Sequence, residues 1–192
     1  STWKKQRAIL RNKEDEPLLK LGFATFFLNR TNVSGILNGG PIGNIKQTGD
    51  YKLNCRFNKK ELIKRIRKIA EYKNKIHVKR MDAMDLVRRI ESESENNKTI
   101  FYLDPPYYLK GESLYMNHYG KDDHVAVGEA IRNINGVRWI VSYDDHVEIR
   151  KIYAGFRSKR HELLHVAHGP RIGKEILFFS PGLSVPRNIA AR

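Results

Sequence analysis

The stretch Thr99-Ile-Phe-Tyr-Leu-Asp-Pro-Pro-Tyr-Tyr108 joins a short apolar run to a stiff polar turn. Residues 100–103 have the length and composition of a buried strand in a sheet that is covered on both faces. Asp104 stands where this strand ends, and Pro105 and Pro106 follow it. Because proline lacks an N–H and restricts the residue before it, no helix can begin there. We predict a rigid turn at the carboxyl end of a strand, where open α/β sheets bind ligands.

The turn offers one carboxylate, peptide carbonyls without neighbouring N–H donors, and the rings of Tyr107 and Tyr108. The exocyclic amine of a nucleobase is a poor nucleophile, because its lone pair is delocalised into the ring. A fixed carboxylate and carbonyl that accept its two N–H bonds favour the pyramidal nitrogen that develops during attack. An adjacent ring can hold an extruded base by stacking, worth roughly 1–3 kcal/mol per base. A proline-rich turn with surface tyrosines is the alternative, and the preceding apolar strand favours a functional site.

Positive charge is concentrated in the first part of the chain. The 192 residues include 36 Lys and Arg against 21 Asp and Glu, a net charge of +15. Residues 1–80 hold 20 basic and 6 acidic side chains, whereas residues 81–192 hold 16 and 15. Solubility does not require charge on one side of the chain. A strongly basic part joined to a nearly neutral part therefore indicates a polyanionic partner, most simply nucleic acid.

The remaining composition is that of an ordinary globular protein, with 40% hydrophobic and 30% charged residues. No apolar run approaches the ~18 residues that a membrane span needs, and the basic start has no signal-peptide pattern. The single cysteine, Cys55, excludes an internal disulfide and offers no zinc cluster. These features predict a cytoplasmic protein without a metal or a membrane contact.

Strands and helices alternate in the second part of the chain, which predicts an α/β fold. Strands are expected at residues 76–81, 100–103, 137–142, 161–166 and 175–180. Helices are expected at residues 85–90, from Asp122 or Asp123 onward, and around residues 149–153. Residues 110–121 are expected to form a mobile lid. The last two strands, joined by a loop that includes Gly173, have no helix between them, which indicates an antiparallel edge.

In the first part, residues 18–28 predict a buried helix, and the Gly-rich residues 31–51 predict loops or a short hairpin suited to a DNA groove. Asn58, with Glu61 three residues later, predicts the N-cap of an amphipathic helix. The basic face of that helix is either solvated or follows a phosphate backbone.

The turn and its strand are similar to the catalytic motif of amino-methyltransferases that use S-adenosylmethionine. Further segments resemble motifs of the Dam-like (D12 class) adenine-specific DNA N6-methyltransferases, in the same order. These segments are Phe27-Leu-Asn-Arg-Thr-Asn-Val-Ser-Gly35, Gly39-Gly-Pro-Ile-Gly43, Gly49-Asp-Tyr-Lys52, Arg56-Phe-Asn58, Met81-Asp-Ala-Met-Asp-Leu-Val87, Trp139-Ile-Val-Ser-Tyr-Asp144 and Gly173-Lys-Glu-Ile-Leu-Phe-Phe179. The resemblance covers roughly residues 20–180. It implies a Rossmann-like methyltransferase sheet with an inserted DNA-recognition subdomain, placed at residues 1–75, and the C-terminal part of the catalytic core at residues 76–192.

The resemblance also implies roles for individual residues. Asp104 and the carbonyl of Pro105, in a motif completed by Pro106 and Tyr107, accept hydrogen bonds from adenine N6, and Tyr107 stacks on the flipped base. Asp104 is expected to be ionised, since an unperturbed aspartate has a pKa of about 3.9. Asp82 and Asp104 are expected to border the cofactor. The residues expected to contact DNA are Arg30, Asn32, Ser34, Lys46, Tyr51, Lys52 and Arg56. The implied reaction is direct transfer of the sulfonium methyl group, with no metal and no covalent enzyme intermediate.

Two departures from the family pattern affect these expectations. Val33 stands where Dam enzymes have an aromatic residue that inserts between bases, so their target sequence is not carried over. The chain also lacks the F-x-G-x-G segment and the K-W/Y-x-G-G-K-like start that bind the methionine and ribose of the cofactor. We therefore expect a truncated chain, without the N-terminal strands, that binds the cofactor weakly by itself.

Three functions compete at this stage. The first is a site-specific DNA adenine methyltransferase that acts on double-stranded DNA, with a cognate restriction endonuclease as a candidate partner. The second is a methyltransferase acting on RNA or a protein amide, and the third is a non-catalytic DNA-binding remnant. A metal site at His161, His165 and His168 is less favoured than a polar strand face. A hydrolase triad around Ser142 is not favoured, since no G-x-S-x-G motif frames that serine.

Overall fold

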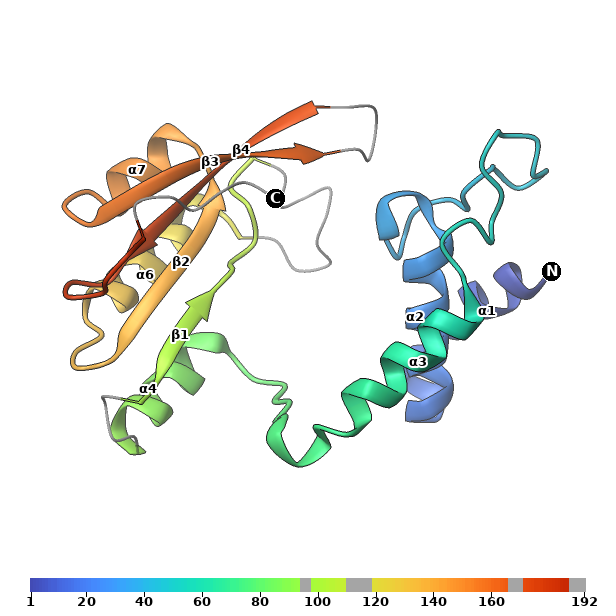
Figure 1. Cartoon of the computed structure of the whole chain (residues 1–192), viewed down its shortest axis with the longest axis horizontal. Helices are drawn as coiled ribbons and strands as arrows, with labels where there is room; N and C mark the ends of the chain where they lie inside the picture. Colours follow the sequence, from blue (N-terminus) through green and yellow to red (C-terminus); the bar gives the residue numbers. More distant parts are fainter. Residues whose placement is uncertain (94–97, 110–118, 166–170, 187–192) are drawn as a thin grey trace. The chain divides into compact units, whose positions relative to one another are not determined.

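The computed structural model divides into two compact units, Ser1–Val78 and Lys79–Arg192 (Figure 1). The structure describes residues 1–93, 98–109, 119–165 and 171–186. The predicted boundary at residues 75 and 76 separates a DNA-recognition region from the C-terminal part of the catalytic core, and those two functions stay predictions. Within the described residues, no helix is both long enough and apolar enough to cross a membrane.

The unit Ser1–Val78 is built from helices and turns. Its α-helices are α1 (Thr2–Arg11), α2 (Leu18–Thr31) and α3 (Lys59–Ala70). Three short 3-10 helices lie at Lys13–Asp15, Val33–Gly35 and Lys73–Lys75. The predicted N-cap of α3 is confirmed, because the side chain of Asn58 accepts a hydrogen bond from the Glu61 amide at 3.3 Å. The segment between α2 and α3 is mostly turns, with one antiparallel bridge between Asn32 and Pro41.

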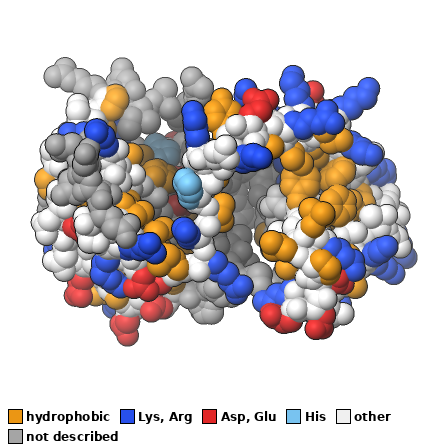
Figure 2. Space-filling view, turned by 90° about the horizontal axis from the view of Figure 1, so that it is seen from below, with side chains coloured by type: hydrophobic (Ala, Val, Ile, Leu, Met, Phe, Trp, Pro, Cys, Tyr) orange, Lys and Arg blue, Asp and Glu red, His pale blue; other side chains and the backbone are white. Residues whose placement is uncertain are grey.

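Helix α2 is not the buried helix that its apolar residues predict. Leu18 is 85% exposed and Leu19 is 88% exposed, whereas Phe27 and Leu28 face the interior. The helix is buried along one face only, and its other side forms an open apolar surface with Ile66 of α3. Figure 2 shows apolar side chains gathered on this unit and bordered by Lys and Arg. A dense apolar sequence therefore marks a helix here without deciding which sides are covered.

The unit Lys79–Arg192 contains a sheet with the strand order β1-β2-β4-β3 among the described residues. The strands are β1 (Ile100–Leu103), β2 (Arg138–Asp144), β3 (Arg157–His165) and β4 (Arg171–Phe179). Strands β1 and β2 are parallel, and β4 is antiparallel to both β2 and β3. The predicted antiparallel edge is confirmed. Gly173 was expected in the connecting loop, but it lies inside β4 and pairs with Leu163.

Three helices supply side chains to the core of the sheet: α4 (Ala83–Glu93), α6 (Lys121–Arg132) and α7 (Val147–Ile152). Figure 1 shows α6 and α7 together on one side of the sheet. Alternate residues of the strands point to this side, as the two-residue period of a strand requires. The most deeply buried of them and of the helices are Ile131, Trp139, Val141, Tyr143, Ile149, Ile176 and Phe178. This mixed α/β arrangement with an open sheet agrees with the predicted α/β class, while the Rossmann-like sheet and the inserted subdomain stay predictions.

Strand β1 is present where it was predicted, but the expectation of a sheet covered on both faces is wrong for the described residues. Phe101 is buried against the helices, whereas Ile100 is 54% exposed and Tyr102 is 62% exposed. The reason is that β1 is the edge strand and the helices cover only the face that carries Phe101.

The predicted strand at residues 76–81 is also wrong. These residues have no regular structure, and Val78 is 88% exposed. An apolar alternation becomes a strand only when a neighbouring strand pairs with its backbone, and none does so among the described residues. The helix predicted to be capped by Asp122 or Asp123 begins two or three residues earlier. Gly120 is its N-cap, and the Asp123 carboxylate accepts a hydrogen bond from the Gly120 amide at 2.8 Å. Most of the predicted lid, residues 110–118, lies outside the described residues.

The close packing of Gly128 in α6 against Ile152 in α7 predicts how substitution of this glycine changes the free energy of unfolding. A Cβ atom on Gly128 would lie 2.2 Å from Cγ2 of Ile152, whereas a Cβ atom on Gly22 of α2 would meet nothing within 4 Å. We expect Gly128→Ala to lower the free energy of unfolding by about 1–3 kcal/mol through overpacking. Gly22→Ala is the matched control and should raise it by about 0.5–1 kcal/mol through helix propensity. Urea unfolding followed by circular dichroism measures both, and a Gly128→Ala chain as stable as Gly22→Ala contradicts the packing.

Candidate active site

The turn after β1 is held by a carboxylate at the end of β2. Because β1 and β2 are parallel, their carboxyl ends lie at the same edge of the sheet. Asp144 Oδ1 accepts a hydrogen bond from the Tyr108 amide at 2.8 Å, and Oδ2 accepts one from the Leu109 amide at 3.0 Å. The two prolines have no N–H to offer. The first two amides after Tyr107 are thus both bound to Asp144, which joins the turn to the neighbouring strand.

The two tyrosines of the turn serve opposite sides of the sheet. The Tyr108 ring stacks on His146, with ring centroids 4.5 Å apart, and lies 5.2 Å from the ring of His124 in α6. Tyr107 instead donates its hydroxyl hydrogen to Oε1 of Glu175 at 2.7 Å. Glu175 precedes the core residue Ile176 in β4, so its side chain points away from the helices.

Asp104 lies at the edge of a cavity of about 150 Å³ between α4 and α6. The cavity is lined by Ala83, Met84, Leu103, Asp104, Pro105, Pro106, Tyr119, Val127 and Ile131. The structure therefore brings Asp104, Pro105 and Pro106 to one wall of the cavity, with mostly apolar side chains around them. Tyr107 follows directly and turns to the other side of the sheet.

The carboxyl group of Asp104 does not have an ordinary pKa. Partial burial raises its pKa above 3.8, and the negative charge of Glu175 raises it further. The expectation of an unperturbed aspartate is thereby corrected. The side chain remains in contact with water, so both effects are limited by screening.

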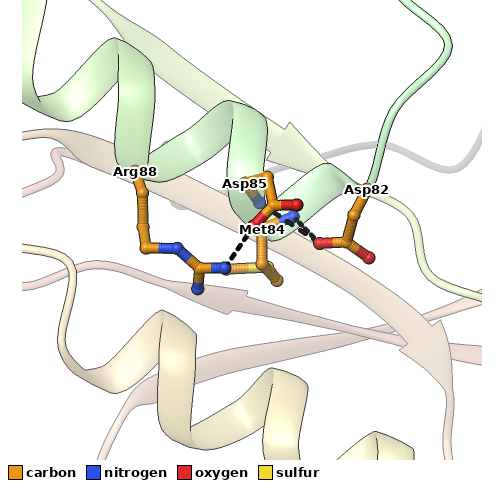
Figure 3. Close-up of polar contacts among 4 residues, drawn as sticks. All are labelled: Asp82, Met84, Asp85 and Arg88. Carbon is orange, nitrogen blue, oxygen red and sulfur yellow. Dashed lines mark hydrogen bonds and ion pairs between the residues drawn. The ribbon is translucent and has the colours of Figure 1, made fainter.

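Asp82 caps the N-terminus of α4 (Figure 3). Its Oδ1 accepts hydrogen bonds from the amides of Met84 at 2.9 Å and Asp85 at 3.2 Å. Figure 3 shows the second oxygen pointing away from the helix. Ala83 and Met84, the next two residues, line the cavity beside Asp104. Burial raises the pKa of Tyr119 in the same cavity, and the charge of Asp82 adds to that increase. Asp82 and Asp104 thus lie near one cavity.

The seven residues expected to contact DNA belong to the unit Ser1–Val78. Arg30 Nε and Nη2 donate to the carbonyl of Arg56 at 3.0 and 2.7 Å, and Arg56 Nη2 donates to the carbonyl of Asn29 at 2.6 Å. These two arginines therefore fasten the end of α2 to the segment before α3. The positive charges of Arg30 and Arg56 remain, but several of their N–H groups already donate hydrogen bonds within the protein.

Asn32 requires a correction, because it is fully buried. Its Oδ1 accepts a hydrogen bond from Trp3 Nε1 at 2.7 Å, and its Nδ2 donates to the carbonyls of Ile36 and Leu37 at 2.8 and 3.1 Å. A buried amide with these partners holds the fold together and is not accessible to DNA. The other four residues are exposed: Ser34, Lys46, Tyr51 and Lys52. Lys52 donates to the carbonyls of Gln47 and Gly49 within its own loop.

Two site residues were not identified from the sequence. Asp144 carried a signal, since a polar residue at the end of a strand parallel to β1 must lie near the turn. Glu175 carried only its place in the family-like segment at residues 173–179, because its position depends on β4 pairing with β2, which sets Glu175 opposite Asp144. Among the described residues, no group of three His, Cys, Asp or Glu side chains is arranged to hold a metal. The side chains of His165 and His168 lie outside the described part.

Most of the chain, including the turn after β1, is similar to one known protein family. No curated protein sequence matches the chain. The family model of the D12 class N6 adenine-specific DNA methyltransferases matches residues 4–166. The match includes Asp82, the turn after β1 and Asp144, and it ends before β4. Because most of the chain is matched, this protein belongs to the D12 class N6 adenine-specific DNA methyltransferase family.

Proposed function

We propose that this adenine-specific DNA methyltransferase transfers a methyl group from S-adenosylmethionine to N6 of an adenine flipped out of double-stranded DNA at a specific sequence. The observation that carries the proposal is the turn after β1. It holds the Asp104 carboxylate and the Pro105 carbonyl beside a cavity, and Asp144 fixes it to the sheet. An acceptor pair that is fixed before the substrate arrives is what transfer to an exocyclic amine requires.

Asp104 and the Pro105 carbonyl accept the two N–H bonds of adenine N6. This draws the nitrogen lone pair out of conjugation with the ring, so that it can attack. When bound, S-adenosylmethionine supplies the methyl group as an electrophilic sulfonium. The negative charge of Asp104 would stabilise the positive charge that develops on N6 as the N–CH3 bond forms and the S–CH3 bond breaks. The sulfur would leave as the neutral thioether S-adenosylhomocysteine, and N6 would then lose one proton to solvent.

The Tyr107 ring holds the flipped base by stacking, worth roughly 1–3 kcal/mol. The family resemblance assigns this role to Tyr107, the last residue of the Asp-Pro-Pro-Tyr motif, and the neighbouring Tyr108 ring is stacked on His146. Unstacking a base from duplex DNA costs a few kcal/mol, so a stacking partner in the site offsets much of that cost.

The residues around the cavity fit the adenine ring of the cofactor. Apolar side chains such as Met84 and Val127 suit a flat ring, and the Asp82 and Asp104 carboxylates lie close by. The volume of about 150 Å³ is below the ~300–1,000 Å³ of a pocket for a whole drug-sized ligand. We propose that Asp82, Met84 and Asp104 border the cofactor ring.

DNA is held by the basic unit, with Lys46, Tyr51 and Lys52 as exposed contacts and Arg30 and Arg56 as charges next to them. The 20 basic and 6 acidic side chains of residues 1–80 support this part of the proposal. The cytoplasmic location and a cognate restriction endonuclease stay predictions from the sequence.

The first test is transfer of labelled methyl from S-adenosylmethionine to duplex DNA. We expect Asp104→Ala to reduce transfer by about 100-fold or more, because it removes a fixed acceptor at the reacting nitrogen. Asp122→Ala makes the same change of charge at an exposed position of α6 and should leave transfer unchanged. Because the F-x-G-x-G segment is not among these residues, the same variants are also made in a chain extended with it at the N-terminus.

Three other results of this assay would contradict the proposal. Transfer that survives Asp104→Ala contradicts the role of Asp104. Transfer to RNA or protein alone replaces DNA as the substrate. DNA binding without transfer by either chain length leaves a DNA-binding protein that does not catalyse.

The acid limb of the pH–rate profile should lie at a higher pH than an aspartate with an ordinary pKa would produce. As pH falls through the raised pKa of Asp104, the carboxylate gains a proton and loses its charge, so transfer declines. Glu175→Gln removes one cause of that shift and should move the limb to lower pH, while burial keeps it above 3.8. Glu162→Gln, at an exposed glutamate of β3, is the control. A limb that does not respond to Glu175→Gln shows that the charge of Glu175 does not raise the pKa of the titrating group, which contradicts this prediction.

DNA binding should depend strongly on salt. If the basic unit contacts 5–8 phosphates, the slope of log affinity against log salt should be roughly −5 to −7. Lys46→Gln should reduce the magnitude of the slope by about 1, and Lys121→Gln in the other unit should not change it. Fluorescence anisotropy of labelled duplex DNA between low and moderate salt measures the slope. A flat response argues against nucleic acid as the substrate.

A further inference from the structure

Glu175 is a buried carboxylate at the centre of a polar row that crosses three strands. It is 8% exposed. In the sheet register it lies opposite Asp144 of β2 on one side and opposite His161 of β3 on the other. Residues directly opposite each other point to the same face, so all three side chains lie on the face away from the helices.

Both oxygens of Glu175 have partners. Oε1 accepts the Tyr107 hydroxyl at 2.7 Å, and Oε2 lies 3.3 Å from Nε2 of His161. A carboxylate buried without partners would cost several kcal/mol. A hydroxyl bound to a carboxylate is a charge-assisted hydrogen bond, which is roughly twice as strong as a neutral one. The contact between Tyr107 and Glu175 is thus well suited to hold a side chain in one orientation.

We propose that Glu175 is a positioning residue that holds the ring of Tyr107 where it stacks on the flipped adenine, with His161 fixing the Glu175 carboxylate. This inference rests on the proposed function. The family match ends at residue 166, so neither Glu175 nor the strand that carries it lies in the matched region.

Contacts at the backbone and at the far end of the ring hold Tyr107. Its backbone is fixed because the next two amides are bound to Asp144, and the far end of its ring is fixed by Glu175. Loss of the second contact removes a directional hydrogen bond that favours one orientation of the ring about its side-chain torsions. A base stacked on a rotated ring is displaced from Asp104, and a displacement of about 1 Å can cost roughly 100-fold in rate.

The test removes the same hydrogen bond from each end. Glu175→Leu keeps the size of the side chain but loses the acceptor, and Tyr107→Phe keeps the ring but loses the donor. We expect each to lower kcat by roughly 10- to 100-fold. Glu175→Gln keeps an oxygen acceptor and should retain kcat within about threefold at neutral pH.

A double-mutant cycle separates positioning from a general loss of structure. The chain with both Glu175→Leu and Tyr107→Phe should be no slower than the slower single variant, because both changes remove one interaction. Additive losses overturn the proposal. Glu162→Leu, at an exposed glutamate of the adjacent strand β3, is the control and should leave kcat unchanged.

A second measurement does not depend on activity. In protein labelled with 3-fluorotyrosine, the fluorine resonance of Tyr107 is assigned from its loss in Tyr107→Phe. We expect one narrow line in the wild type and in Glu175→Gln, and a shifted or broadened line in Glu175→Leu. An unchanged line in Glu175→Leu overturns the proposal. If neither this chain nor the extended chain transfers a methyl group, the proposed function fails while this resonance still decides whether Glu175 holds Tyr107.

Discussion

The pair of hydrogen bonds from the amides of Tyr108 and Leu109 to Asp144 is the constraint on which the site depends. Two consecutive prolines make the turn stiff but deprive it of donors, so it cannot be stabilised by its own backbone ladder. The amides that follow the prolines bind instead to the Asp144 carboxylate at the end of the neighbouring parallel strand. This contact sets Asp104 and Pro105 at the wall of the cavity and sends the two tyrosine rings to opposite sides of the sheet.

Three carboxylates lie at the same edge of the sheet, and the negative charge of each has different surroundings. Asp144 is stabilised by two amides, and Glu175 by a hydroxyl and an imidazole. Asp104 has water and a raised pKa. Such a site favours partners that donate hydrogen bonds or carry positive charge, and it does not attract phosphates. Positive charge lies instead in the first part of the chain, whose net charge of +14 over residues 1–80 contrasts with +1 over the remainder, and we propose that this part attracts DNA.

Apolar composition marked some helices and strands correctly, but it was a poor guide to their burial. Residues 18–28 and 100–103 form a helix and a strand, yet Leu18, Leu19 and Tyr102 are largely exposed. Periodicity reports which backbone geometry suits a segment, whereas burial depends on what lies against it. The predicted strand at residues 76–81 failed for a related reason. Its pattern was adequate, but no neighbouring strand pairs with it in the described part of the chain.

The sequence by itself determined what depends on near neighbours along the chain. It determined the strand and stiff turn around Asp104, the cap at Asn58, the antiparallel final strands, and motifs whose order is that of the D12 class. Only the tertiary structure decided that Asp144, 36 residues after Tyr108, anchors the turn, and that Glu175, 68 residues after Tyr107, holds its ring. It also decided that Asn32 is buried and that the pKa of Asp104 is raised. These contacts join distant segments, and strand pairing and packing, which no local pattern records, bring such segments together.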